Sequence, residues 1–229
     1  MLDQTKLENS LNIYFKNAEL LKMAFTHSSY VNEASTEKIE SNERLEFLGD
    51  SILEMAATIF LYKKFPALPE GELTALRSAL VRGNNLALVS EELGLGEHLF
   101  LSKGEEVSGG RTKKYILANV AESLIGAIFL DQGYEVAEKF IDTHILSKVG
   151  QVFELGLHID SKSKFQEKAQ ELENTTPDYR LISETGPDHD KVFQMGVFLN
   201  DILVATGEGS SKQKAEQEAA REGIVVKRW

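Results

Sequence analysis

The residues of this chain most suited to chemistry are three carboxylates within one otherwise apolar segment. Glu43, Glu46 and Asp50 stand in the run Asn-Glu-Arg-Leu-Glu-Phe-Leu-Gly-Asp-Ser, residues 42–51. Their spacings of three, four and seven residues place them on one face of a helix. Ionised side chains on a packed helix are costly unless something pairs with them, and hard cations such as Mg²⁺ or Mn²⁺ prefer oxygen ligands. The periodicity alone indicates an acidic stripe that could hold a metal.

A second polar pair lies in another apolar segment, residues 116–126. Asn119 and Glu122 are three residues apart and can face the same way on a helix. Gly49 and Gly126 lack side chains, which would let the two helices approach closely. Four side-chain oxygens, completed by waters, would suit octahedral Mg²⁺. The expected metal ligands are Glu46, Asp50, Asn119 and Glu122.

Composition and charge restrict the possible classes of protein. The chain has 229 residues, a net charge of −11 and no cysteine, so disulfides and thiolate metal sites are excluded. Residues 1–159 carry 23 acids against 15 Lys and Arg, and residues 160–229 carry 13 against 10. Neither part is basic, so any nucleic-acid binding would depend on local clusters. The polar N-terminus and the lack of a long apolar run predict no signal peptide, no membrane span and a cytoplasmic location.

The first two-thirds of the sequence has the apolar periodicity of helices. Apolar residues recur at helical spacing in five stretches, which predicts an all-α domain of several short helices. The polar, glycine-rich stretch 101–114 predicts a loop with a basic end. The helical stretches are 17–31, 43–62, 72–94, 115–131 and 134–149.

The composition changes around residues 150–162, where glycines and a polar run indicate a linker. Beyond it, a helix, three strands with alternating apolar residues and a second helix predict a small α+β domain. Asn200-Asp201 fits a tight hairpin turn, and Ser210 or Ser211 fits the cap of the last helix. The expected elements are 161–173, 178–185, 191–199, 202–208 and 211–224. The expected domains are 1–153 (all-α) and 161–229 (α-β-β-β-α), joined by a linker at 154–160.

The run from residue 42 to 51 resembles the signature of the ribonuclease III family almost letter for letter. The resemblance implies an all-α catalytic domain in which Glu46, Asp50 and Glu122 bind a catalytic divalent metal. It assigns the catalytic roles to Asp50 and Glu122. The position of Asn119 is commonly aspartate in that family. Asparagine still offers a carbonyl oxygen but adds no negative charge, so a natural variant and an inactivating change both stay open.

The resemblance also implies roles outside the four expected ligands. Glu43 matches a residue near the site, interpreted as structural or engaged across a dimer, and Glu70 matches one sometimes implicated near the metal. His27, in the run Thr-His-Ser-Ser-Tyr at 26–30, belongs to a motif interpreted as structural rather than as an RNA contact. Three cations before the second acidic helix could hold phosphates of the cut strand, with a solvated charge run as the alternative. They are Arg111, Lys113 and Lys114.

Residues 160–229 resemble a double-stranded-RNA-binding domain over their full length. The resemblance implies that Gln166 on the first helix and His189 in the loop before the second strand reach the minor groove. Lys212 and Lys214 begin the last helix, where backbone N–H groups and lysines form an anion site. Gln213 stands where the family often has a third basic residue. Such a module senses duplex shape over about 16 bp.

Together these resemblances imply a Mg²⁺-dependent endoribonuclease of double-stranded RNA, with Mn²⁺ as a possible substitute. They imply a homodimer through the catalytic domains. The apolar signature helix, with Phe47, Leu48 and Leu53, could supply part of the interface. Each site would cut one strand and leave 5′-phosphates and short 3′ overhangs, in ribosomal RNA precursors and structured messenger RNAs. Two alternatives stay open: an RNA-binding protein disabled at Asn119, and a metal-dependent hydrolase of small phosphoesters. The C-terminal module argues against the second.

Overall fold

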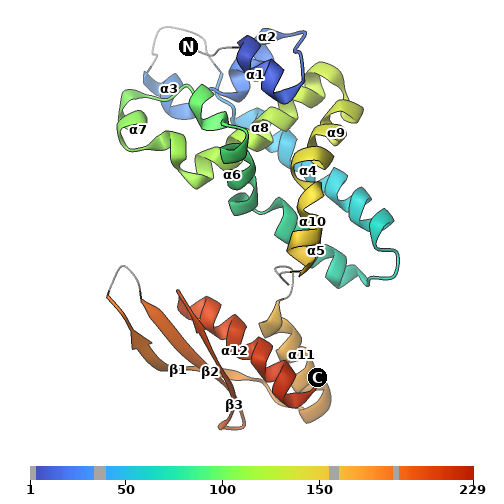
Figure 1. The fold of residues 1–229 in the computed structure, drawn as a ribbon, viewed down its shortest axis with the longest axis vertical. Coiled ribbons are helices and arrows are strands. Elements are labelled where there is room, and N and C mark those ends of the chain that lie inside the picture. Colours follow the sequence, from blue (N-terminus) through green and yellow to red (C-terminus); the bar gives the residue numbers. More distant parts are fainter. Residues whose placement is uncertain (1–3, 34–39, 155–159, 188–190) are drawn as a thin grey trace. The chain divides into compact units, whose positions relative to one another are not determined.

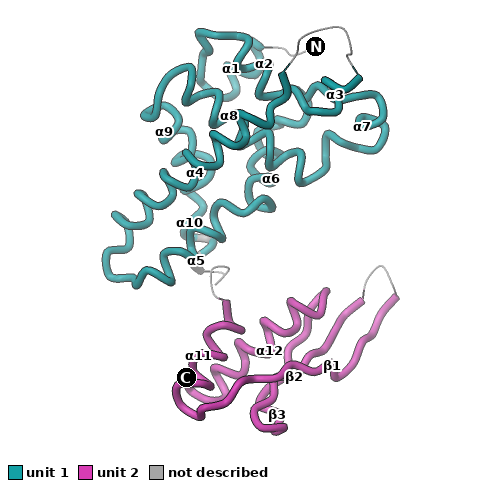
Figure 2. The backbone as a smooth tube through the Cα atoms, turned by 180° about the vertical axis from the view of Figure 1, so that it is seen from behind, with its two compact units in different colours: residues 1–158 teal, residues 159–229 magenta. Residues whose placement is uncertain are grey.

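The computed structural model describes residues 4–33, 40–154, 160–187 and 191–229. The chain divides into two compact units, residues 1–158 and 159–229 (Figure 2). Among the described residues, no helix is long and apolar enough to cross a membrane.

The first unit is helical, as predicted, and the long helix α8 runs through its centre (Figure 1). Val120, Leu124 and Ile128 on α8 are fully buried, and α8 packs against α4, α6, α9 and α2. The helices are α1 (Gln4–Leu11), α2 (Ala18–Ala24), α3 (Ser28–Glu33), α4 (Glu43–Lys64), α5 (Glu70–Val81), α6 (Gly83–Glu92), α7 (Lys103–Val107), α8 (Lys114–Gln132), α9 (Tyr134–His144) and α10 (Val149–Glu154). Short 3₁₀ helices span Leu95–His98, Gly110–Thr112 and Leu146–Lys148.

Helices α4 and α8 approach each other closely because glycine stands at two contact positions. A Cβ atom on Gly49 would overlap the backbone carbonyl of Glu122, and one on Gly126 would overlap the carbonyl of Leu45. The prediction that both glycines permit this approach is confirmed. The contact fixes the separation of the two helices that carry the acidic residues.

Several predicted boundaries in this unit are wrong, each for a local reason. The stretch predicted as one helix at 17–31 is interrupted after Ala24, because Thr26 forms a bridge with Phe100. The stretch at 72–94 is interrupted at Arg82, whose ψ of 146° is extended. The predicted loop at 101–114 contains α7, because the Ser102 side chain accepts a hydrogen bond from the Glu105 backbone and caps that helix. Helices α1 and α10 were not predicted.

The second unit is a three-stranded antiparallel sheet with both helices on one face (Figure 1), as predicted. Phe165, Val197 and Ala219 are fully buried between the helices and the sheet. Asn200 and Asp201 both have positive φ, as a tight hairpin turn requires. The elements are α11 (Ser161–Glu173), β1 (Asp178–Thr185), β2 (Val192–Leu199), β3 (Ile202–Gly209) and α12 (Lys212–Lys227).

Candidate active site

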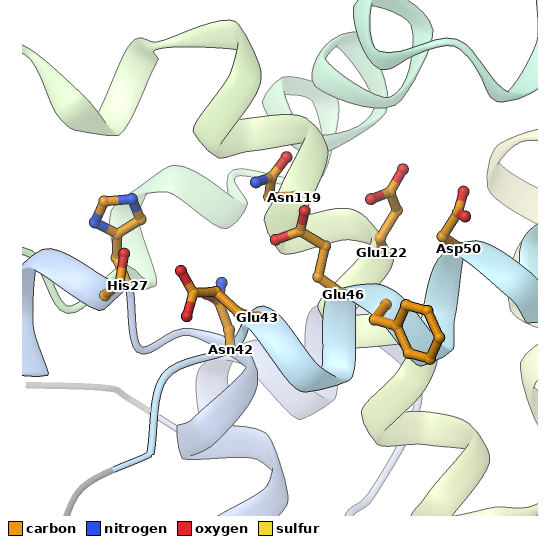
Figure 3. Close-up of a pocket in the computed structure, with 9 residues that line it drawn as sticks. His27, Asn42, Glu43, Glu46, Asp50, Asn119 and Glu122 are labelled. Carbon is orange, nitrogen blue, oxygen red and sulfur yellow. The ribbon is translucent and has the colours of Figure 1, made fainter.

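An acidic cavity of about 550 Å³ lies between α4, α8 and the segment that precedes α3 (Figure 3). Helix α4 contributes the carboxylates that the sequence places on one face, and α8 contributes the second polar pair. All four expected metal ligands therefore line one cavity, together with Glu43. The lining residues are His27, Ser28, Asn42, Glu43, Glu46, Phe47, Asp50, Asn119 and Glu122.

The carboxyl groups of the cavity are poorly compensated. Burial, followed by the charges of Asp50 and Glu46, raises the pKa of Glu122 to about 7. Burial and then the Glu43 charge raise the pKa of Glu46, while a hydrogen bond from the Asn119 side chain lowers it in part. Within the described part of the chain, no Lys or Arg forms an ion pair with Glu46, Asp50 or Glu122. A cation from outside the chain would relieve this unfavourable charge.

The donor set suits a hard divalent cation. Three carboxylates and one carboxamide present oxygen atoms, the ligand type that Mg²⁺ and Mn²⁺ prefer. Among the described residues, no three His, Cys, Asp or Glu side chains are already gathered as a ready-made metal site. Rotation of these side chains would therefore accompany binding of an ion.

Asn42 links the elements around the cavity. Its backbone N–H donates to the Thr26 carbonyl at 2.8 Å, and its side-chain Nδ2 donates to the Ala24 carbonyl at 3.3 Å. The Ser123 hydroxyl on α8 donates to the Asn119 carbonyl of its own helix at 2.7 Å and also lies 3.3 Å from the Asn42 carbonyl. The start of α4 is thus tied both to α8 and to the segment that carries His27. In the sequence Asn42 stands out only as part of the signature, since these partners lie far away along the chain.

Glu70 does not line the acidic cavity. It stands in the first turn of α5, where its Oε1 accepts a hydrogen bond from the Thr74 hydroxyl at 3.1 Å. The structure does not bring Glu70 to the cavity of its own chain, so a role near the metal stays a prediction.

Two of the cations expected to contact phosphates are engaged within the chain. The Arg111 guanidinium pairs with Glu106 through Nε and Nη2 and donates to the Gly96 carbonyl at 2.9 Å. The Lys113 ammonium pairs with Glu105 at 2.6 Å. These contacts indicate that both cations stabilise the loop around α7. Lys114 is exposed and lines a second cavity with Lys113, Arg82, Gly83, Asn84 and Tyr115.

The second unit exposes most of the residues expected to bind RNA. Gln166 is exposed on α11, and Lys212 and Lys214 are exposed in the first turn of α12. Ser211 caps this helix, because its side chain accepts a hydrogen bond from the Lys214 backbone. The Lys212 ammonium lies 6.0 Å from the centre of the Phe193 ring. His189 lies outside the described residues.

Comparison with known proteins gives the family of this chain. Residues 17–149 match the family model for ribonuclease-III-like proteins, and residues 161–224 match the model for the double-stranded RNA binding motif. This chain belongs to the ribonuclease III family. The Ribonuclease 3 of Enterococcus faecalis is 44% identical over 220 residues, which cover 96% of this chain and 95% of the relative. That of Geobacillus kaustophilus is 43% identical over 225 residues, covering 97% and 90%.

A solved structure agrees with this assignment. The nuclease domain of ribonuclease III from Campylobacter jejuni is 39% identical, with a TM-score of 0.56, and the match covers 62% of this chain and 96% of that domain. As a ribonuclease III with a double-stranded-RNA-binding domain, this protein is an endoribonuclease that acts on double-stranded RNA. Enzymes of the ribonuclease III family generally depend on a divalent metal.

Proposed function

We propose that this ribonuclease III hydrolyses the phosphodiester backbone of duplex RNA in the acidic cavity between α4 and α8. Mg²⁺ is the proposed ion, with Mn²⁺ as a substitute. The supporting observation is the convergence of four oxygen-bearing side chains on one cavity in which no Lys or Arg of the described chain pairs with them. The proposed ligands are Glu46, Asp50, Asn119 and Glu122.

The chain's own groups have distinct parts in this proposal. When bound, the ion would activate a water and stabilise the leaving 3′ oxygen. The Asn119 side chain lowers the pKa of Glu46 and so favours its ionised, metal-binding form. Burial raises the pKa of the Glu122 carboxyl to about 7, so this group would release a proton when it becomes a ligand. Asp50 and Glu122 are the proposed catalytic carboxylates.

The exposed face of α4 supports a homodimer as the working form. Phe47 at the cavity and Tyr62 near the end of α4 are 78% and 74% exposed, unusual values for large apolar side chains. Leu53, by contrast, is fully buried in the core of its own unit, so its expected place in the interface is wrong. A related nuclease-domain structure from Campylobacter jejuni is described as showing structural flexibility in a region involved in dimer formation.

A two-fold dimer would set two acidic cavities across one duplex. Each cavity would cut one strand, giving 5′-phosphates and short 3′ overhangs. Ribosomal RNA precursors and structured messenger RNAs are the proposed substrates. Gln166, His189, Lys212 and Lys214 are the proposed RNA contacts of the second unit.

The test is incubation with end-labelled long double-stranded RNA, with and without Mg²⁺. Wild type, Asn119→Asp and Glu122→Gln are compared, and duplex binding is measured beside cleavage. The proposal predicts Mg²⁺-dependent cleavage by wild type and none by Glu122→Gln, which should still bind the duplex. Cleavage by Asn119→Asp alone would instead support an RNA-binding protein whose catalytic site is switched off at one residue.

A further inference from the structure

The His27 ring at the edge of the acidic cavity has a defined hydrogen-bonding state. Its Nδ1 accepts a hydrogen bond from the Ser29 backbone N–H at 3.2 Å and lies 2.8 Å from the Ser29 hydroxyl. A backbone N–H can only donate, so Nδ1 carries no proton. The neutral ring therefore carries its proton on Nε2, as a donor not used by Ser29.

The position of this ring is held from several sides. The His27 backbone N–H donates to the Phe100 carbonyl at 3.1 Å, and the Ser29 hydroxyl oxygen accepts from the Ser102 backbone N–H at 3.1 Å. Asn42, at the start of α4, donates its backbone N–H to the Thr26 carbonyl. His27 is thus fixed relative to the helix that carries the acidic residues. Figure 3 shows the ring at the cavity with one nitrogen on the edge that faces Asn119 in this view.

The cavity offers few hydrogen-bond donors to an incoming strand. Glu43, Glu46, Asp50 and Glu122 only accept when ionised. The Asn42 amide is buried and donates to the Ala24 carbonyl, so the Asn119 amide and the Ser28 hydroxyl are the other side-chain donors among the residues that line the cavity. Phosphate and ribose oxygens of RNA need donors, and a carboxylate-lined cavity repels them otherwise.

We propose that His27 is a substrate-contacting residue, whose Nε2–H donates to a phosphate or ribose oxygen of the strand in the acidic cavity. This inference rests on the proposed function of that cavity. The sequence motif alone indicates a structural role for His27, and the substrate contact is a second role for the same ring. Nδ1 fulfils the structural part through Ser29, while Nε2 remains for the substrate. A contact to the reacting strand would act during cleavage, whereas the second unit supplies separate groups for duplex binding.

Two substitutions separate the two ring nitrogens. In His27→Asn, the side-chain oxygen can take the place of Nδ1 and accept from Ser29, but no donor reaches the position of Nε2. In His27→Gln, the terminal amide can place an N–H near the position of Nε2, but Ser29 no longer has its acceptor. Single-turnover cleavage of duplex RNA at saturating enzyme, the KM for that RNA and the midpoint of thermal unfolding are measured for both variants.

The inference predicts that His27→Asn slows cleavage by about 10- to 100-fold, the range for removing a hydrogen bond to a charged group. Its KM and unfolding midpoint should stay near those of wild type. His27→Gln should cleave faster than His27→Asn, although its unfolding midpoint is lower. The reverse order, with His27→Asn as active as wild type and His27→Gln impaired, would mean a structural histidine only and would overturn the inference.

Wild type and Glu122→Gln in the same assay separate this inference from the proposed function. If wild type does not cleave with Mg²⁺ or Mn²⁺, the function fails and the inference falls with it. If wild type cleaves, Glu122→Gln does not, and His27→Asn equals wild type, the inference alone fails. The rise in unfolding midpoint with Mn²⁺ should be the same in His27→Asn and wild type. A smaller rise would place His27 in the metal site and would overturn a substrate contact.

Discussion

Asn119 on α8 and Glu46 on α4 interact across the acidic cavity. The Asn119 side chain lowers the pKa of Glu46 against burial and the Glu43 charge, which raise it. Asparagine therefore acts on the cavity in two ways, as a potential oxygen ligand and as a neutral partner for a neighbouring carboxylate. An aspartate at this position would add a ligand charge and remove the donor.

Asn119→Asp should make the metal-free protein less stable and metal binding stronger. A fourth carboxylate in a cavity that already contains raised pKa values should reduce the free energy of unfolding by about 1 kcal/mol. The same charge should increase the rise in unfolding midpoint produced by Mn²⁺. Asn32→Asp, at an exposed position on α3, is the control for the charge change alone. Equal responses to Mn²⁺ in wild type and Asn119→Asp would exclude Asn119 from the ligand set.

Glu122 should make the stability of the metal-free protein depend on pH near neutrality. Its pKa is about 7 in the folded protein against an ordinary value of 4.5, so the folded state binds more protons between these values. The free energy of unfolding contributed by Glu122 is therefore greatest at acidic pH and falls as the pH rises through about 7. Thermal unfolding of wild type and Glu122→Gln across this range, without metal, should show a difference that grows with pH. A constant difference would contradict a raised pKa at Glu122.

Stabilisation by a divalent metal should increase with pH, whereas the contribution of Glu122 to the stability of the metal-free protein decreases. Binding requires an ionised Glu122 carboxylate and releases its proton. The rise in unfolding midpoint caused by Mg²⁺ should therefore grow as the pH increases through about 7 and be small in Glu122→Gln. A rise that is independent of pH in wild type would place the ion elsewhere.

Much of the second unit could be predicted from sequence because its signals are local. Helix α11 and strand β1 begin and end at the predicted residues, and the structure adds that Asp160 caps α11. In the first unit, the wrong helix boundary near Thr26 depends on a residue that is far away in the sequence. Nothing near Thr26 in the sequence indicates its bridge with Phe100, which ends the helix predicted there.

The candidate site shows the same division. Helical spacing placed Glu46 and Asp50 correctly on one face, and glycine indicated where α4 meets α8. The side chains of Arg111 and His27 could not be interpreted in this way. Arg111 is bound by Glu106 and Gly96, and His27 is bound by Ser29. Only the folded chain shows these partners and therefore which polar atoms could still contact a substrate.

Gly49→Ala should severely destabilise the first unit. An added methyl group would overlap the Glu122 carbonyl on α8, and the helix backbone cannot yield as a flexible side chain can. Overpacking of this kind typically costs about 1–3 kcal/mol, and a contact with backbone belongs at the upper end. Gly71→Ala is the matched control, because its Cβ would meet nothing within 4 Å and it lies in helix α5. The control should be neutral or slightly stabilising in thermal unfolding, since alanine favours helix.

Lys212→Ala and Lys214→Ala should weaken duplex binding for all RNA sequences alike. Both lysines are exposed at the start of α12, where phosphate binding is proposed, and removing either ammonium group should reduce the slope of log affinity against log salt by about 1. The cap at Ser211 uses the backbone of residue 214, so the helix should remain intact in both variants.

Arg221→Ala removes one exposed cation from the middle of the same helix and is the charge control. Affinity measured over a range of salt concentrations tests the prediction. If Arg221→Ala lowers the slope as much as the lysine variants do, the effect comes from net charge, and the start of α12 is not the phosphate site.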